Sequence, residues 1–218
     1  MSELLISPLI EHYHKTSELT YQFRRQRNRL FISLLAVIGL ATLLTYDIPE
    51  TNALLIDMFA NLLNIEDPGR IAELKKGFPF AILQSILLIV VFYLMVNLYH
   101  RSISVSQNFH YLGALEKEIR KQLKLDKKSV AFTLDGDFYW KNRPPLLGLV
   151  KWVYMLMLGL LLLAFLLGRI AEDVAEREFW FVLIDVLLAV PTLIFFYGYA
   201  VGAVKLDQAR PFKRKLEE

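Results

Sequence analysis

The sequence predicts an all-α membrane protein with four transmembrane helices arranged as two helical hairpins. Hydrophobic residues make up 55% of its 218 residues, which exceeds the share in an average soluble domain. Four apolar runs are each long enough to cross roughly 30 Å of hydrocarbon as a helix. A long polar segment separates the first pair of runs from the second. The predicted spans are 30–46, 78–99, 146–168 and 179–204.

The segment before the first span, 1–29, is polar and carries charges of both signs. It ends in a dense basic collar, formed by Arg24, Arg25, Arg27 and Arg29. A cleavable signal peptide would begin with a short basic region and pass directly into its apolar run. We therefore interpret 30–46 as an uncleaved first span.

The first loop, 47–77, contains a helical stripe of apolar residues. Such a stripe is typical of a helix that lies in the membrane interface, outside the cytoplasm in this case. The stripe comprises Leu54, Leu55, Met58, Phe59, Leu62 and Leu63. Asp67-Pro68-Gly69 then turns the chain back. The second span, 78–99, carries two polar residues, Gln84 and Asn97.

The polar segment 100–145 is expected to begin with a cytosolic amphipathic helix. Its apolar residues recur at helical spacing, namely Val105, Phe109, Leu112, Leu115 and Ile119. Neither Pro nor Gly occurs between 81 and 111, so this helix can continue directly from the second span.

A short β-hairpin is predicted next, around Asp135-Gly136. A two-residue Asp-Gly loop between strand-forming runs favours a type I′ turn. A two-stranded hairpin is marginal alone, so it needs the amphipathic helix, the bilayer surface or another subunit to pack against. Its aromatic residues are candidates for docking a partner: Phe132, Phe138, Tyr139 and Trp140.

A short charged loop, 169–178, joins the last two spans, and the fourth span contains Asp185. An acid inside a span usually faces a partner or a water-filled cavity. Asp185 is therefore a candidate pore-lining or proton-carrying residue, with Gln84 at a similar depth as a possible hydrogen-bond partner. The alternative is an interfacial acid that reaches the headgroups beside Arg177.

The fourth span also carries features that affect helix geometry and packing. Pro191 removes a backbone donor at mid-span and is either a gate hinge or a packing feature. Gly198 and Gly202 match the small-xxx-small pattern that lets helices approach closely. They serve either contacts between subunits or packing within one subunit.

Lys and Arg are concentrated in 1–29, 100–145 and the basic tail 205–218 rather than in the other two loops. The positive-inside rule then places both termini and the central segment in the cytosol, which suggests a bacterial inner membrane. Basic residues at the membrane surface serve lipid adhesion or the docking of an acidic partner. In the central segment these are Lys121, Lys124, Lys127 and Lys128.

Catalytic motifs are absent from the sequence, so we expect no enzyme, no cofactor and no metal site. His12 and His14 point to different faces of a helix, and Cys does not occur. The formal charge of +3 is too small to indicate nucleic acid as a ligand.

The leading hypothesis is a homo-oligomeric, channel-like effector that couples a cytosolic signal to membrane permeability. The alternative is a membrane anchor, scaffold or sensor subunit that recruits a soluble cytosolic protein; a small transporter is the third possibility. In size and layout alone, the chain is similar to small membrane effectors and sensors of bacterial defence systems.

Overall fold

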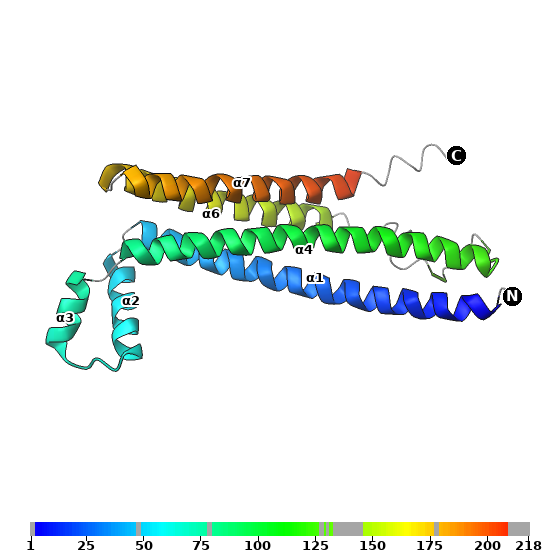
Figure 1. Ribbon diagram of the computed structural model, residues 1–218, viewed down its shortest axis with the longest axis horizontal. Helices are drawn as coiled ribbons and strands as arrows, with labels where there is room; N and C mark the ends of the chain where they lie inside the picture. The colour runs from blue at the N-terminus through cyan, green and yellow to red at the C-terminus, as the bar shows by residue number, and fades with distance from the viewer. Residues whose placement is uncertain are drawn as a thin grey trace. The chain divides into compact units, whose positions relative to one another are not determined.

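The computed structural model describes residues 3–46, 49–77, 80–126, 129, 131–132, 146–176 and 179–208 (Figure 1). Most of these residues are helical, and none of them is in a strand. The helices are α1 (Glu3–Thr45), α2 (Pro49–Leu62), α3 (Pro68–Gly77), α4 (Phe80–Gln122), α6 (Leu146–Glu176) and α7 (Phe179–Gln208). Four of them, α1, α4, α6 and α7, are long and apolar enough to cross a membrane. The four-span prediction is confirmed at this level, and it indicates a multi-pass membrane protein.

Two of these helices are much longer than a membrane span. α1 and α4 each have 43 residues, which corresponds to about 65 Å at about 1.5 Å per residue. That length is about twice the thickness of the hydrocarbon layer. The first span is thus continuous with the polar N-terminal segment, and the second span is continuous with the helix that follows it.

The chain forms two compact units. Unit 1 contains 1–31, 97–155 and 197–218, and unit 2 contains 32–96 and 156–196. α1, α4, α6 and α7 each contribute residues to both units, so each is continuous from one unit into the other.

The core of unit 1 forms where the N-terminal part of α1 meets the C-terminal part of α4. Tyr13 of α1 is buried with Leu112, Leu115 and Ile119 of α4. The Tyr13 hydroxyl donates a hydrogen bond to the buried Glu116 carboxylate at 3.0 Å. α1 therefore covers the apolar stripe of the polar segment, a partner that the sequence did not suggest.

The first half of the predicted β-hairpin does not form a strand in the described part of the chain. Ser129, Ala131 and Phe132 are described, and none of them is in a strand. Phe132 has a φ of 54°, a left-handed conformation that extended strands do not contain. Its ring packs instead against Tyr13, with ring centroids 5.7 Å apart. The Asp135-Gly136 turn and the aromatic residues Phe138, Tyr139 and Trp140 lie outside the described residues.

Arg120 explains why this segment departs from the strand prediction. Its guanidinium donates hydrogen bonds to the carbonyls of Ser129 and Ala131 at 2.7 Å each, and to that of Asp126 at 3.0 Å. Two of these carbonyls belong to the predicted first strand, where they would have served strand pairing. In the structure these two carbonyls accept hydrogen bonds from Arg120, which lies 9 to 11 residues earlier in the chain. A local turn signal does not predict such a contact.

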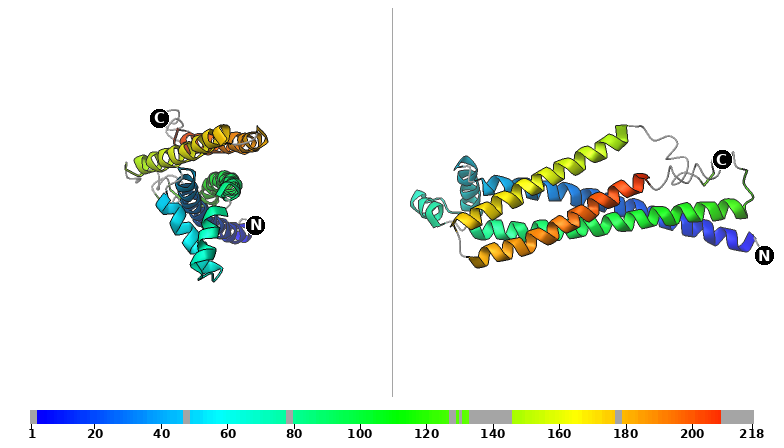
Figure 2. Two further views of the ribbon diagram at one scale, coloured as in Figure 1. Left: turned by 90° about the vertical axis from the view of Figure 1, so that its left-hand side faces the viewer. Right: turned by 90° about the horizontal axis from the view of Figure 1, so that it is seen from above.

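Within unit 2, the first loop folds into α2 and α3, which pack against each other and lie crosswise to the adjoining parts of α1 and α4 (Figures 1 and 2). α2 ends in a Schellman motif. Asn64 is left-handed with a φ of 53°, and the Ile65 N–H donates to the Ala60 carbonyl at 2.8 Å. Asp67 then caps α3, since its carboxylate accepts from the Gly69 N–H at 2.9 Å, and Pro68 occupies the first helical position that suits it.

Ile119→Ala tests the core of unit 1. Removing most of a fully buried side chain leaves a cavity, and we expect a loss of about 2–5 kcal/mol in the stability of this unit. Hydrogen exchange in the N-terminal part of α1 and the C-terminal part of α4 measures the loss. Lys117→Ala, at an exposed position of the same helix, is the control. Equal exchange in both variants would contradict this packing.

Candidate functional site

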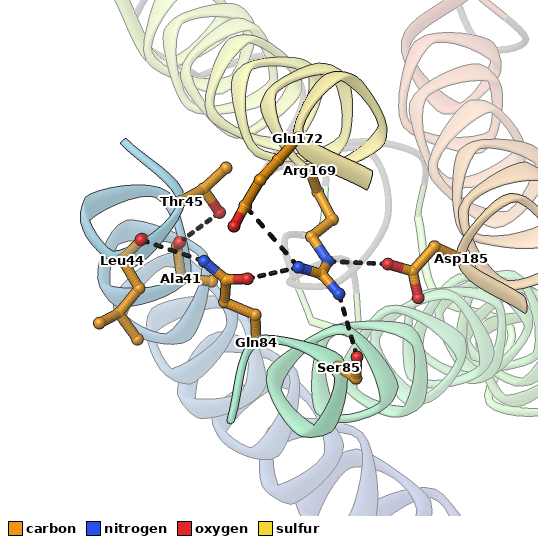
Figure 3. Close-up of polar contacts among 8 residues, drawn as sticks. All are labelled: Ala41, Leu44, Thr45, Gln84, Ser85, Arg169, Glu172 and Asp185. Atoms are coloured by element: carbon orange, nitrogen blue, oxygen red, sulfur yellow. Dashed lines mark hydrogen bonds and ion pairs between the residues drawn. The ribbon is translucent and has the colours of Figure 1, made fainter. Parts of the chain in front are cut away.

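A cluster of buried polar side chains lies in unit 2, where all four long helices contribute to it (Figure 3). Arg169 of α6 donates from Nε to the Asp185 carboxylate of α7 at 2.7 Å. One terminal nitrogen of Arg169 donates to the side-chain oxygen of Gln84 on α4. The other donates to the Ser85 hydroxyl oxygen, also on α4, at 3.1 Å. The Gln84 amide in turn donates to the Leu44 carbonyl of α1 at 3.1 Å.

Arg169 and Gln84 each continue the inner apolar face of their helix. Arg169 follows Leu158, Leu162 and Phe165 at spacings of four, three and four, and all four are buried. Gln84 precedes Leu88, buried on the same face of α4, by four residues. Helical periodicity therefore directs both side chains into the interior.

The cluster is enclosed by protein. Arg169, Gln84 and Asp185 are only 1%, 2% and 3% exposed. Desolvating two charges is expensive, and it is offset only when the geometry is good and the remaining donors are satisfied. The Arg169 guanidinium meets that requirement, because three of its nitrogens point at side-chain oxygens.

A second acid lies at the edge of the cluster. Glu172, one turn after Arg169 on α6, has a carboxylate oxygen 3.7 Å from the guanidinium, and its side chain is 28% exposed. A methyl group at Gly168 would lie 3.0 Å from the Thr45 side chain, so this glycine lets α1 and α6 approach closely. The arrangement links the helices through one cation, two acids and hydrogen bonds.

Sequence reasoning identified Asp185 and Gln84 as candidates but missed Arg169, the residue at the centre of the cluster, and Ser85. The sequence predicts that Asp185 and Gln84 lie at similar depth, and in the structure both accept hydrogen bonds from Arg169. The sequence prediction places Arg169 in the loop 169–178 instead. In the structure α6 continues to Glu176, so Arg169 is helical and buried. The periodicity of the inner face of α6 was the signal that could have found it. Arg177, the alternative partner, lies outside the described residues.

The other polar and hinge candidates lie apart from the cluster. Asn97 is half-buried and belongs to unit 1. Pro191 lies inside α7, which continues through it. The adjacent Thr192 is fully buried, and its hydroxyl donates to the Leu188 carbonyl at 2.7 Å. A hinge at Pro191 stays a prediction.

The two glycines of α7 have different surroundings. A Cβ atom added at Gly198 would lie 2.8 Å from the Tyr99 ring of α4, whereas one added at Gly202 would meet nothing within 4 Å. Gly198 therefore serves packing within one subunit, and Gly202 leaves space on the surface of the chain.

The candidate basic residues lie along the helices of unit 1. Arg25, Arg29, Lys121 and Lys124 are exposed, and Arg24 and Arg27 are half-buried. Lys124 is the left-handed residue that ends α4. Arg101 was not identified from the sequence; its guanidinium lies 5.0 Å above the ring of Phe23, a cation–π contact that joins α4 to α1. Lys127 and Lys128 lie outside the described residues.

Removing one member of the Arg169–Asp185 pair leaves a buried charge without its partner. We therefore expect Arg169→Met and Asp185→Leu each to cost about 3–5 kcal/mol. The double variant should recover much of that loss, because neither charge of this pair is left buried without the other; the partly exposed Glu172 remains. Unfolding in mixed micelles with a denaturing detergent, followed by helicity, measures the stabilities. Ser85→Ala is the control, with an expected loss of about 0.5–1.5 kcal/mol; additive losses in the double variant would contradict the pairing.

Gly198→Ala and Gly202→Ala form a matched pair of variants on α7. The first forces a methyl group against the Tyr99 ring, and overpacking of this kind costs about 1–3 kcal/mol. The second should be neutral or stabilising by up to about 1 kcal/mol, because Ala favours helix more than Gly does. The same unfolding assay compares them. A loss of assembly in Gly202→Ala alone would instead place Gly202 at a contact between subunits.

Comparison with known proteins adds no relative to this picture: no protein-family model matches the chain, and no significant match exists among curated proteins or solved structures. Its function must therefore be inferred from its own residues.

Proposed function

We propose that this protein is a non-enzymatic membrane effector whose subunits assemble in the bilayer and convert an event at unit 1 into a change in membrane permeability. The observation that carries the proposal is the continuity of α1 and α4. Each is a single helix of 43 residues that has one part in unit 1 and the other in unit 2. In the proposed orientation unit 1 faces the cytosol, in agreement with the basic residues of both chain ends.

α4 provides the path for the signal. Its C-terminal part contributes Leu112, Leu115 and Ile119 to the buried cluster of unit 1. Its N-terminal part contributes Gln84 and Ser85 to the polar cluster of unit 2. A helix transmits a shift or rotation along its axis, because its hydrogen-bonded backbone deforms little. A ligand or partner that favours one arrangement of unit 1 would then shift the population of arrangements in the spans.

The buried ion pair refines the role proposed for Asp185. An acid that is 3% exposed and bonded to Arg169 is suited to holding α6 and α7 in one arrangement rather than to lining an open pore. In this proposal the cluster maintains the closed state, and a permeation path opens when the spans rearrange. Pro191 is the proposed hinge, because α7 lacks one backbone donor there.

One observation favours the alternative, a scaffold that recruits a soluble protein. Arg120 holds the carbonyls of Asp126, Ser129 and Ala131, which follow α4. In this alternative, the predicted docking residues Phe138, Tyr139 and Trp140, further along the sequence, bind the partner. The two functions differ in whether the protein alone conducts ions.

Loosening the core of unit 1 should imitate the signal. We expect Leu112→Asp to raise ion flux through liposomes several-fold above that of the unchanged protein, since a buried charge separates α4 from α1. Lys117→Asp, at an exposed position of α4, should leave the flux unchanged. Flux is measured with a potassium-sensitive dye at equal protein content.

A cross-link distinguishes signalling from mere damage. His12 Nε2 and the Tyr111 hydroxyl oxygen are 2.9 Å apart across α1 and α4, so Cys residues at these two positions face each other and a bis-maleimide that spans the length of the two lost side chains can join them. We expect the link to suppress the added flux of Leu112→Asp. If no variant conducts while the assembly stays intact, the effector function is wrong. A soluble partner lost on Trp140→Ala would then support the scaffold.

A further inference from the structure

The helix α2 carries an outward apolar face that no other described part of the chain covers. Leu54, Met58, Leu62 and Leu63 are 59% to 73% exposed. Ile56 and Ala60, on the other side of the helix, are 4% and 1% exposed. The six-residue stripe seen in the sequence is therefore divided, because Leu55 and Phe59 are half-buried. Four large side chains along three turns remain open.

Chain connectivity places α2 next to the end of a membrane-type helix. α1 ends at Thr45 and α2 begins at Pro49, and four residue steps reach at most about 14 Å. α3 ends at Gly77 and α4 begins at Phe80. Both ends of the α2–α3 pair are thus tied to the ends of membrane-type helices. Within unit 2, α2 lies crosswise to those helices (Figures 1 and 2), as a helix in the plane of a membrane surface does.

We propose that α2 lies in the membrane interface on the side where α1 ends, with Leu54, Met58, Leu62 and Leu63 inserted among the lipid chains. A helix of this kind buries its apolar face about 5–10 Å into the boundary between headgroups and acyl chains. The inserted helix anchors the ends of α1 and α4 at a fixed depth. This inference does not depend on the proposed permeability function.

The charges of the two helices indicate which lipids are required. Segment 47–77, which contains both helices, carries six acidic residues and three basic ones, Arg70, Lys75 and Lys76. A surface with this balance gains nothing from anionic headgroups, which attract clustered Lys and Arg. Insertion is therefore driven by apolar contact alone, and zwitterionic phosphatidylcholine is sufficient.

The experiment uses the full chain, which contains no Cys, in phosphatidylcholine nanodiscs. A nitroxide label is attached to Met58→Cys, and to Asp57→Cys as the matched control on the neighbouring polar face. Paramagnetic resonance compares collisions of each label with oxygen, which partitions into lipid, and with a water-soluble nickel chelate. We expect the oxygen-to-nickel ratio to be several-fold higher at Met58→Cys than at Asp57→Cys, and unchanged when anionic lipid is added.

Two results would overturn the inference. Equal access of nickel to both labels would place α2 in water. Shielding of the Met58→Cys label from both reagents would show that protein, such as a second copy of the chain, covers this face. Leu62→Cys repeats the measurement one turn further along α2, so that a single variant that assembles poorly does not decide the outcome.

Discussion

The buried ion pair between Arg169 and Asp185 is the interaction on which the packing of unit 2 depends. A charged side chain inside a membrane costs about 2.5–3.5 kcal/mol by insertion scales, so neither residue would be stable there alone. Each neutralises the other at 2.7 Å, and Gln84 extends the network to the carbonyl of Leu44. Apolar helices slide against each other with little energetic preference, because lipid is as apolar as they are. The polar contacts therefore fix how far each helix is shifted along its axis relative to its neighbours, which apolar packing alone does not determine.

The described core of unit 1 is stabilised mainly by apolar contacts. Its core is a small apolar cluster around Leu112 and Ile119, closed by Tyr13 and the ring of Phe132. The buried acid Glu116 of α4 accepts a hydrogen bond from the Tyr13 hydroxyl beside this cluster. Such a core is held by the hydrophobic effect, which requires water around it. Apolar burial therefore stabilises this part of unit 1, whereas charge pairing and hydrogen bonds link the helices at the polar cluster of unit 2.

Much of the fold could be predicted because its causes are local. The length of each apolar run predicts four long helices, and the absence of Pro and Gly from 81 to 111 predicts a continuous α4. Arg169 was missed because a charge at the end of an apolar run is usually the start of a loop. The pairing of Tyr13 with Glu116, 103 residues apart, leaves no mark in either segment. The hairpin prediction rests on the local Asp135-Gly136 turn signal alone. The hydrogen bonds from Arg120 to the carbonyls of Ser129 and Ala131, in the predicted first strand, are not part of that signal.

The sequence separation within the ion pair has a consequence for biogenesis. Arg169 and Asp185 are 16 residues apart, on helices that only two residues separate. The pair therefore forms within a single helical hairpin, without help from the rest of the chain. α6 and α7 can leave the insertion machinery together, with their charges already neutralised. They then dock onto α4 through Gln84 and Ser85, so that the last third of the protein is assembled as one piece rather than as two separate spans.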